Sequence, residues 1–221
     1  MDTLHELAEQ GAPAGTAVVA EVQTAGRGSR GRAWASPPGG LWLSLLVRPA
    51  PAPLELVSLR AGLAVAEALE RLGIGERIAI KWPNDLMLGD RKTGGLLCEA
   101  RWHGATPSWI VIGLGLNVAN PPGPPLTAIA TYLGAVRPGL QPAELVAPMV
   151  AALRGLGSGS GPLTPAEQAR FARRDWLRGR AIEQPVAGIV EGIAPDGALR
   201  VRAPEGRTVE ARAGSVALSF S

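Results

Sequence analysis

The strongest constraint on the fold is one amphipathic helix pattern followed by several strand patterns with no helix between them. Apolar residues recur at helical spacing from Leu56 to Leu72, and Gly73 follows as a stop signal. Strand patterns come next, at Arg77–Lys81, Gly95–Trp102 and Trp109–Gly113. Because helices and strands do not alternate one by one, we expect an α+β fold, with a mixed sheet that carries its helices on one face.

Weaker patterns extend this layout in both directions. Before the long helix we expect a short helix at Leu4–Gln10, a buried strand at Thr16–Val22 and a second strand at Leu41–Arg48. After the strands, a helix is predicted from about Ala143 to Arg154, with a kink at Pro148.

The last third of the chain begins with a spacer and a well-marked helix start. Gly155–Gly161 consists mostly of glycine and serine and is expected to be a connection. Thr164 is the predicted first cap of the next helix, because Pro165 suits the first helical position and Glu167 completes a capping box.

Beyond Trp176 the pattern changes to short alternating strands. Gln184–Leu218 has turn signals at Asp196-Gly197 and Pro204–Gly206, which indicate a compact all-β tail docked on the main part. We therefore expect two domains, residues 1–178 and 179–221.

Composition narrows the classes of function. The net charge is only +3 and the basic residues are spread along the chain, which gives weak support for nucleic-acid binding. A single cysteine, Cys98, excludes an internal disulfide and a cysteine-rich metal site, and the two histidines are isolated. The longest apolar run, Leu41–Val47, is too short for a membrane span, and no signal-peptide pattern opens the sequence. These features predict a cytoplasmic protein that does not bind membranes.

The first candidate site is the arginine–glycine loop, Gly26–Trp34. Its glycines allow close approach of the backbone to a ligand. Arg27, Arg30 and Arg32 offer guanidinium groups that suit phosphate or carboxylate, and Trp34 offers a flat face for a purine. Taken alone, this loop is equally consistent with a solvated basic turn.

The second candidate is the lysine segment, Lys81–Gly95, which holds the only two lysines of the sequence, Lys81 and Lys92. In a chain that otherwise uses arginine, a lysine marks a place where a compact ammonium is needed. Asp85 can hold Mg²⁺ or position a partner group, and Asn84 can cap a turn. Farther on, Val111–Asn117 is a predicted buried strand whose glycines leave room for a flat ligand.

The segments GRGSRG, KWPND, DRKTGG and IGLGLN occur in an order and at a spacing that resemble the biotin protein ligases. The resemblance covers roughly residues 3–120, and Gly188–Leu218 is similar to the small SH3-like C-terminal domain of that family. It implies the fold shared by class II aminoacyl-tRNA synthetases and biotin ligases. It also implies that biotin and ATP are joined with release of pyrophosphate, and that the biotinyl group then passes to a lysine of a biotin carboxyl carrier protein.

The same resemblance assigns roles to individual residues. Lys92 and Arg27 are the implied catalytic residues, and Mg²⁺ is implied as a companion of ATP at Asp85. The residues implied in biotin binding are Gln23, Gly26, Arg27, Gly28, Ser29, Lys92, Gly95 and Gly113. Those implied in binding ATP or the adenylate are Arg27, Arg30, Trp34, Asn84, Asp85, Lys92 and Asn117.

Further expectations follow from the resemblance. The family places a Ser-Thr pair that contacts biotin just before the position of Met1, so either the true start lies upstream or those contacts are missing. No winged-helix segment precedes the loop, so gene repression is not expected. The acceptor is expected to be a subunit of acetyl-CoA carboxylase, and a homodimer through sheet edges is expected.

Three alternatives remain open at this stage. A lipoate–protein ligase shares the fold and the adenylate chemistry but differs in its loop motifs. A non-catalytic Arg/Gly nucleic-acid module should interleave basic and aromatic residues, whereas the β-tail has one aromatic, Phe220. A relative that binds the carrier protein without catalysis is the third.

Overall fold

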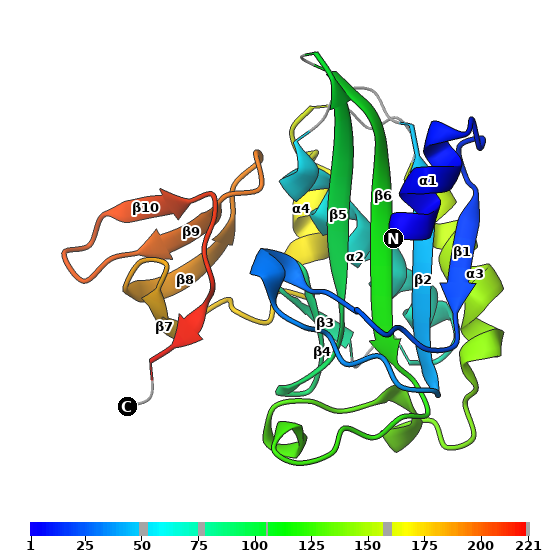
Figure 1. Ribbon diagram of the computed structural model, residues 1–221. Coiled ribbons are helices and arrows are strands. Elements are labelled where there is room, and N and C mark those ends of the chain that lie inside the picture. Colours follow the sequence, from blue (N-terminus) through cyan, green and yellow to red (C-terminus); the bar gives the residue numbers. More distant parts are fainter. Residues whose placement is uncertain (49–52, 75–77, 105, 157–160, 220–221) are drawn as a thin grey trace.

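The computed structural model describes residues 1–48, 53–74, 78–104, 106–156 and 161–219. Its larger part is a six-stranded sheet in the order β1-β2-β6-β5-β4-β3 (Figure 1). The strands are β1 (Ala17–Ala20), β2 (Gly40–Val47), β3 (Ile78–Lys81), β4 (Asp85–Leu88), β5 (Arg91–His103) and β6 (Thr106–Asn117). Every neighbouring pair is antiparallel, so the expectation of a mixed sheet was wrong. Tight connections such as the one between β4 and β5 reverse the chain directly, and antiparallel pairing follows.

Helices cover both faces of this sheet, and not one face as expected. The long helix α2 (Leu54–Arg71) and α3 (Pro142–Arg154) pack on one face, whereas α1 (Asp2–Glu9) packs on the other, against β1, β2 and β6 (Figure 1). The sequence of α1 is short, and its few apolar positions do not tell which face it covers. Among the described residues, no helix has both the length and the apolar character required to cross a bilayer.

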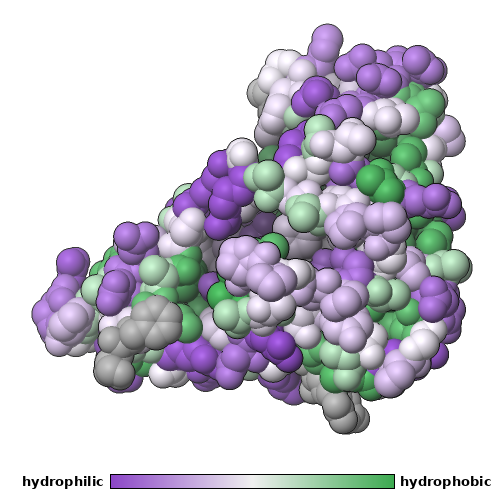
Figure 2. Space-filling view, turned by 60° about the horizontal axis from the view of Figure 1, so that its bottom comes forward, coloured by the Kyte–Doolittle hydropathy of each residue, from purple (hydrophilic) through white to green (hydrophobic). Residues whose placement is uncertain are grey.

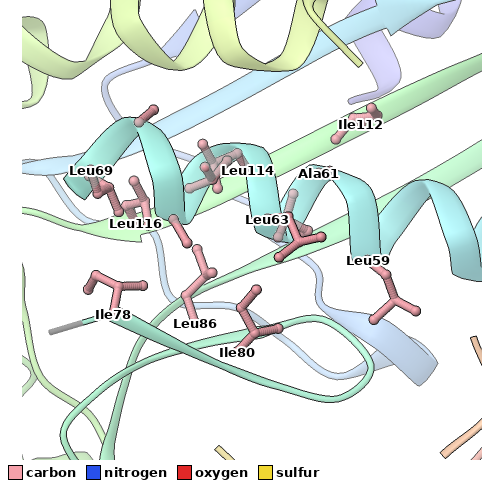
Figure 3. Close-up of a cluster of buried hydrophobic side chains, with 14 of the residues drawn as sticks. Leu59, Ala61, Leu63, Leu69, Ile78, Ile80, Leu86, Ile112, Leu114 and Leu116 are labelled. Carbon is pink, nitrogen blue, oxygen red and sulfur yellow. The ribbon is translucent and has the colours of Figure 1, made fainter. Parts of the chain in front are cut away.

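The main core lies between α2 and the sheet. Twelve of the eighteen residues of α2 are buried, and Figure 3 shows Leu59, Leu63 and Leu69 of this helix facing apolar side chains of the strands. The strand partners labelled there are Ile78, Ile80, Leu86, Ile112, Leu114 and Leu116. Each fully buried Leu or Ile contributes about 1.5–3 kcal/mol relative to an exposed one, so this contact is a major source of stability.

The strands predicted for the main sheet lie close to their expected positions, but the sheet contains one strand that was not predicted. The structure adds β4, which begins at Asp85, where the sequence indicated only a turn. The strand expected to be buried at Thr16–Val22 is instead the edge strand β1, and the side chain of Val19 is 46% exposed. The strand expected from Arg77 begins at Ile78 in the structure, and Arg77 lies outside the described residues.

The cap predicted at Thr164 is confirmed, and the helix before it begins with a capping box that was not predicted. Both α3 and α4 (Pro165–Ala172) begin with a capping box and a proline in the first turn, and α3 runs through Pro148 without a break. For α4 the box consists of Thr164 and Glu167, as predicted. Residues 157–160 of the expected spacer lie outside the described residues.

The C-terminal part is a second antiparallel sheet in the order β10-β9-β8-β7-β11. Its strands are β7 (Ala181–Gln184), β8 (Gly188–Ile193), β9 (Leu199–Arg202), β10 (Thr208–Ala211) and β11 (Ala217–Leu218). Within the described residues β10 and β11 do not pair, so the expected SH3-like barrel is not closed. Phe220 lies outside the described residues.

This smaller sheet packs against the main part through its loops. The turn at Gly197 accepts a 2.9 Å hydrogen bond from the buried indole Nε1 of Trp82 and lies against Leu56 and Leu59 of α2. Leu163, before α4, donates a backbone hydrogen bond to Pro195. Figure 2 shows the smaller sheet as a lobe beside the main body, with the surface hollowed where the two meet.

Candidate active site

The face of the sheet opposite α2 has a bare patch of backbone, the glycine floor, made of Gly95, Gly113 and Gly115. Gly95 pairs with Gly115 across β5 and β6, and Gly113 precedes Gly115 by two positions in β6, so all three lie on this face. Side chains of Met1 and Trp34 lie directly on the floor. A Cβ on Gly113 would meet Met1 Sδ at 2.7 Å, and one on Gly115 would meet Trp34 Nε1 at 3.0 Å. The floor therefore accommodates flat groups only because its residues lack side chains.

Lys92 lies at the end of this floor. Its Nζ donates a 2.5 Å hydrogen bond to Asp85 Oδ1 and lies 4.9 Å from the centre of the Trp34 ring. Its backbone is held on both sides by the segment after β6, because its N–H bonds to Ile129 O and its carbonyl accepts from Thr131 N. The carboxylate and the aromatic ring hold the Lys92 side chain in place. The structure thus brings Lys92, Asp85 and Gly95 of the lysine segment together with Trp34 of the arginine–glycine loop, which the sequence offered as separate candidates.

The arginine–glycine loop folds back on itself as a narrow hairpin. Gln23 pairs with Ser36 and Arg27 with Ala33, and Trp34 N–H donates to Gly26 O at 2.9 Å. A Cβ on Gly26 would lie 2.3 Å from Trp34 O, so glycine is required there for the close approach of two chain segments. Gln23 is fixed by the Ser36 hydroxyl, which donates to its Oε1.

Arg27 is held by two carboxylates. Its Nε and Nη2 donate to the two oxygens of Glu99 at 2.8 and 3.0 Å, and its Nη1 and Nη2 donate to Asp2 at 2.8 and 2.6 Å. The hydrogen bonds from Arg27 are the main cause that lowers the pKa of both Glu99 and Asp2. Glu99 also accepts from His5 Nε2 at 3.2 Å. In this arrangement Arg27 is a fixed cation and not a mobile one.

His5 completes this group from the interior of the protein. Trp109 Nε1 donates to His5 Nδ1 at 3.0 Å, so the ring proton is on Nε2, which faces Glu99. Burial is the largest cause that lowers the pKa of His5, followed by the nearby charge of Arg101. A neutral ring keeps both hydrogen bonds, whereas a protonated ring loses the acceptor for Trp109.

A cleft of about 240 Å³, here called the inter-sheet cleft, separates the arginine–glycine loop from the smaller sheet. Its lining combines Ser29, Arg30 and Arg32 of the loop, Glu55, Lys81–Asp85, and residues 212–216. Arg30, which has a left-handed backbone (φ 62°), reaches across it and donates to Ser215 Oγ at 2.7 Å. Burial lowers the pKa of Lys81, whose Nζ lies 5.4 Å from the centre of the Trp176 ring. The cleft carries several cations and opens beside Asp85.

The two asparagines of the predicted site have structural partners. Asn84 Nδ2 donates to Leu96 O, and Leu96 N–H donates back to Asn84 O, which ties the start of β4 to β5. Asn117, which is buried, donates to Thr131 O at 2.9 Å and accepts from Asn120. Both therefore shape the ends of strands, and their predicted contacts with ATP stay predictions.

Asp85 is the one predicted metal ligand. Its carboxylate is 22% exposed and is paired with Lys92, and the described residues contain no group of three His, Cys, Asp or Glu that could hold a metal ion. Mg²⁺ commonly uses one or two carboxylates together with substrate phosphates. Asp85 thus fits as a single ligand to a metal that arrives with a phosphate group, and not as part of a preformed metal cage.

The sequence reasoning missed Asp2, His5 and Glu99. Asp2 and Glu99 contact Arg27, and His5 contacts Glu99, so α1, the loop and β5 are joined by pairs of residues that lie up to 94 positions apart. No local pattern connects residues so far apart. The sequence holds one indication of this group, because Glu99 is an acidic residue with apolar neighbours in a predicted strand.

Comparisons with known proteins identify the family of the chain. Residues 1–117 match the model of the Biotin/lipoate A/B protein ligase family. A biotin--[acetyl-CoA-carboxylase] ligase of Paracoccus denitrificans is 35% identical over 206 residues, which cover 87% of this chain and 86% of the relative. The bifunctional ligase/repressor BirA of Bacillus subtilis (strain 168) is 43% identical over 124 residues, which cover 54% of this chain and 38% of that relative. The match therefore spans well under half of the length of the Bacillus protein.

A solved structure extends the likeness over nearly the whole chain. The biotin protein ligase from Aquifex aeolicus in complex with biotin and ATP superposes with a TM-score of 0.82 at 26% identity. The superposition covers 97% of this chain and 94% of that one. The smaller sheet therefore has a counterpart in that protein as well.

Proposed function

Because the chain belongs to the biotin/lipoate A/B protein ligase family, we propose that it is a biotin protein ligase. In the first step an oxygen of the biotin carboxylate attacks the α-phosphorus of ATP, and pyrophosphate leaves. In the second step a lysine amine of a biotin carboxyl carrier protein attacks the acyl carbon of biotinyl-AMP. An amide forms, the amine loses a proton, and AMP leaves.

The position of Lys92 carries this proposal. It stands between the glycine floor and the inter-sheet cleft, beside Asp85 and under the ring of Trp34. A carboxylate lying on the floor and a phosphate entering from the cleft would both meet the same ammonium. A fixed cation at the point where negative charge develops is a major source of catalysis.

On the floor side, the predicted biotin contacts are Gln23, Gly26, Arg27, Gly28, Ser29, Lys92, Gly95 and Gly113. Two observations support biotin binding on the glycine floor. The floor offers bare backbone to a fused ring system, and Gln23 lies in the hairpin that crosses it. The side chain of Met1 lies over Gly113 and would have to move when a ligand binds there.

On the cleft side, the predicted contacts of ATP are Arg27, Arg30, Trp34, Asn84, Asp85, Lys92 and Asn117. Arg30, Asn84 and Asp85 line the cleft. Trp34 is half-buried, and its buried Nε1 has no hydrogen-bond partner among the described residues, so a ligand acceptor would satisfy it. Mg²⁺ would arrive with ATP, where Asp85 would hold it and it would supply charge neutralisation of the phosphates.

The chain's own residues would contribute orientation and exclusion of water. Lys92 would neutralise charge on the α-phosphate as pyrophosphate leaves, and again on AMP as the amide forms. The arginine–glycine loop would close over the mixed anhydride, which water otherwise hydrolyses. The proposed acceptor is the carrier subunit of acetyl-CoA carboxylase, since the Paracoccus relative is named for that substrate. We also propose the division into domains 1–178 and 179–221, and a homodimer.

The test combines purified protein, biotin, Mg-ATP and a carrier domain, and measures pyrophosphate release and the mass of the carrier. We expect stoichiometric pyrophosphate and a carrier heavier by one biotinyl group. A parallel reaction with lipoate separates the two activities of the family. Pyrophosphate with lipoate but not with biotin would replace the proposal by lipoate ligation, and none with either acid would refute ligase activity.

A further inference from the structure

Resting on the proposed function, we propose that the two carboxylates on Arg27 have opposite roles. Glu99 is a positioning residue that keeps the guanidinium aimed at the site. Asp2 holds the place on Arg27 that the anionic group of a ligand takes.

In this structure most of the N–H donors of Arg27 already form hydrogen bonds. A guanidinium has five N–H groups, and the bonds to Asp2 and Glu99 use four of them. A phosphate that binds Arg27 through two parallel bonds must therefore displace one of the two carboxylates.

Exposure decides which carboxylate is displaced. The side chain of Asp2 is 69% exposed, whereas that of Glu99 is 23% exposed. Water readily solvates Asp2 once it is released, so exchanging it costs little. Displacing Glu99 would instead leave a partly buried charge without its partner, which costs much more free energy.

The surroundings hold Glu99 in place and leave Asp2 movable. Glu99 lies within β5, opposite Val111 of β6, and its Oε2 also accepts from the 3%-exposed His5, which Trp109 fixes from behind. Asp2 is the first residue of α1, where the helix has no side-chain cap. One carboxylate is thus part of the rigid sheet, and the other is at the end of a short helix.

The proposal predicts that the two neutral isosteres act in opposite directions. We expect Asp2→Asn to slow the release of biotinyl-AMP roughly two- to fivefold, since a surface pair of modest strength no longer competes with the ligand. We expect Glu99→Gln to speed the release about tenfold or more, because Arg27 loses its charged anchor. Release is measured by chasing preformed labelled intermediate with an excess of unlabelled biotinyl-AMP, with circular dichroism as the check on folding.

Two controls isolate Arg27 as the mediator. Glu6→Gln removes an exposed charge from the same helix and should leave release unchanged. In an Arg27→Ala background, Asp2→Asn should lose its effect, as expected when two residues act through one contact.

The outcomes separate this inference from the proposed function. A wild-type protein that neither forms nor binds biotinyl-AMP refutes the function. A wild-type protein that retains biotinyl-AMP, with both variants changing release in the same direction, refutes the exchange on Arg27. The same holds if Asp2→Asn keeps its effect without Arg27.

Discussion

At the scale of single residues, Lys92 gives the sharpest prediction. Replacing it by Ala should lower the rate of biotinyl-AMP formation by a factor of about 10²–10³, because one fixed cation at the reacting phosphate is removed. Its pair with Asp85 is partly exposed, so the free energy of unfolding should change by no more than about 1 kcal/mol. Single-turnover pyrophosphate release and urea unfolding measure the two effects. The adjacent exposed Arg91→Ala is the matched control and should change neither.

Arg27 should affect the retention of biotinyl-AMP more than its formation. We expect Arg27→Ala to shorten the half-life of enzyme-bound biotinyl-AMP by about tenfold, because charge-assisted bonds to the phosphate are lost. The rate of its formation should fall less than in Lys92→Ala. Comparing formation with retention in the same preparation measures the difference. An unchanged half-life would contradict the role of the arginine–glycine loop.

How far the sequence predicts the site depends on the distance over which its residues interact. Lys92, Asp85 and Gly95 lie within one short segment, and motif spacing was sufficient to group them. The group of Asp2, His5 and Glu99 on Arg27 depends on α1 packing over the sheet, which no local pattern specifies. The hydrogen bonds of Asn84 and Asn117 could not be predicted either. Their partners, Leu96 and Thr131, are determined by the pairing of strands and loops.

At the scale of elements, the pair of Arg60 and Glu167 ties α2 to α4. Arg60 Nε donates to Glu167 Oε1 at 2.7 Å, and this bond is the main cause that lowers the pKa of Glu167 from 4.5 to about 2. A lowered pKa stabilises the fold above the unfolded value and is lost as the pH falls through the folded value. Glu167→Gln should therefore cost roughly 3 kcal/mol at pH 7, and the difference should disappear between about pH 4.5 and 2.

Denaturant unfolding across that pH range checks this prediction. Glu144→Gln is the matched control, because Glu144 occupies the same place in the capping box of α3 but makes only a 3.5 Å pair with Arg137 at the surface. Its effect should be about 1 kcal/mol. Equal losses in the two variants would assign the stability to the caps alone and not to the bond with Arg60.

The elements themselves were predicted well where a signal is local. The spacing of apolar residues located α2, and the capping box at Thr164 located the start of α4. The direction of strand pairing was predicted wrongly, because it depends on how short connections reverse the chain. Strand β4 was missed because Lys81–Asp85 contains Pro83 and polar residues, which are typical of a turn, while Asp85 also pairs with Gly95 as the first strand residue.

At the scale of the whole molecule, Asp175 lies where the two sheets meet. Its backbone pairs with Ile80 of β3, and its Oδ2 is near the position that a Cβ of Gly192 in β8 would take. Burial raises the pKa of Asp175 from 3.8 to about 6, and Oδ2 has no hydrogen-bond partner among the described residues. A raised pKa in an acid means stability that is complete below the unfolded value and is lost as the pH rises through the folded value.

The unfolding free energy of the wild type, relative to Asp175→Asn, should therefore fall by up to roughly 3 kcal/mol as the pH rises from about 4 to above 6. Asn keeps the acceptor for Leu177 N–H, so the local turn survives the substitution. Thermal unfolding of both proteins between pH 4 and 8 gives the comparison. A difference that does not vary with pH would show that Asp175 carries no buried charge.

The scarcity of lysine has a chemical consequence for a protein that would store an acyl anhydride. Such a compound acylates amines, and arginine side chains remain protonated and unreactive under these conditions. The chain has only two side-chain amines, and both lie beside the proposed site. Burial lowers the pKa of Lys81, which raises the fraction of free amine there, while Lys92 is paired with Asp85. No lysine occurs elsewhere in the sequence, so acylation of a lysine by the bound anhydride would be confined to the two positions beside the proposed site.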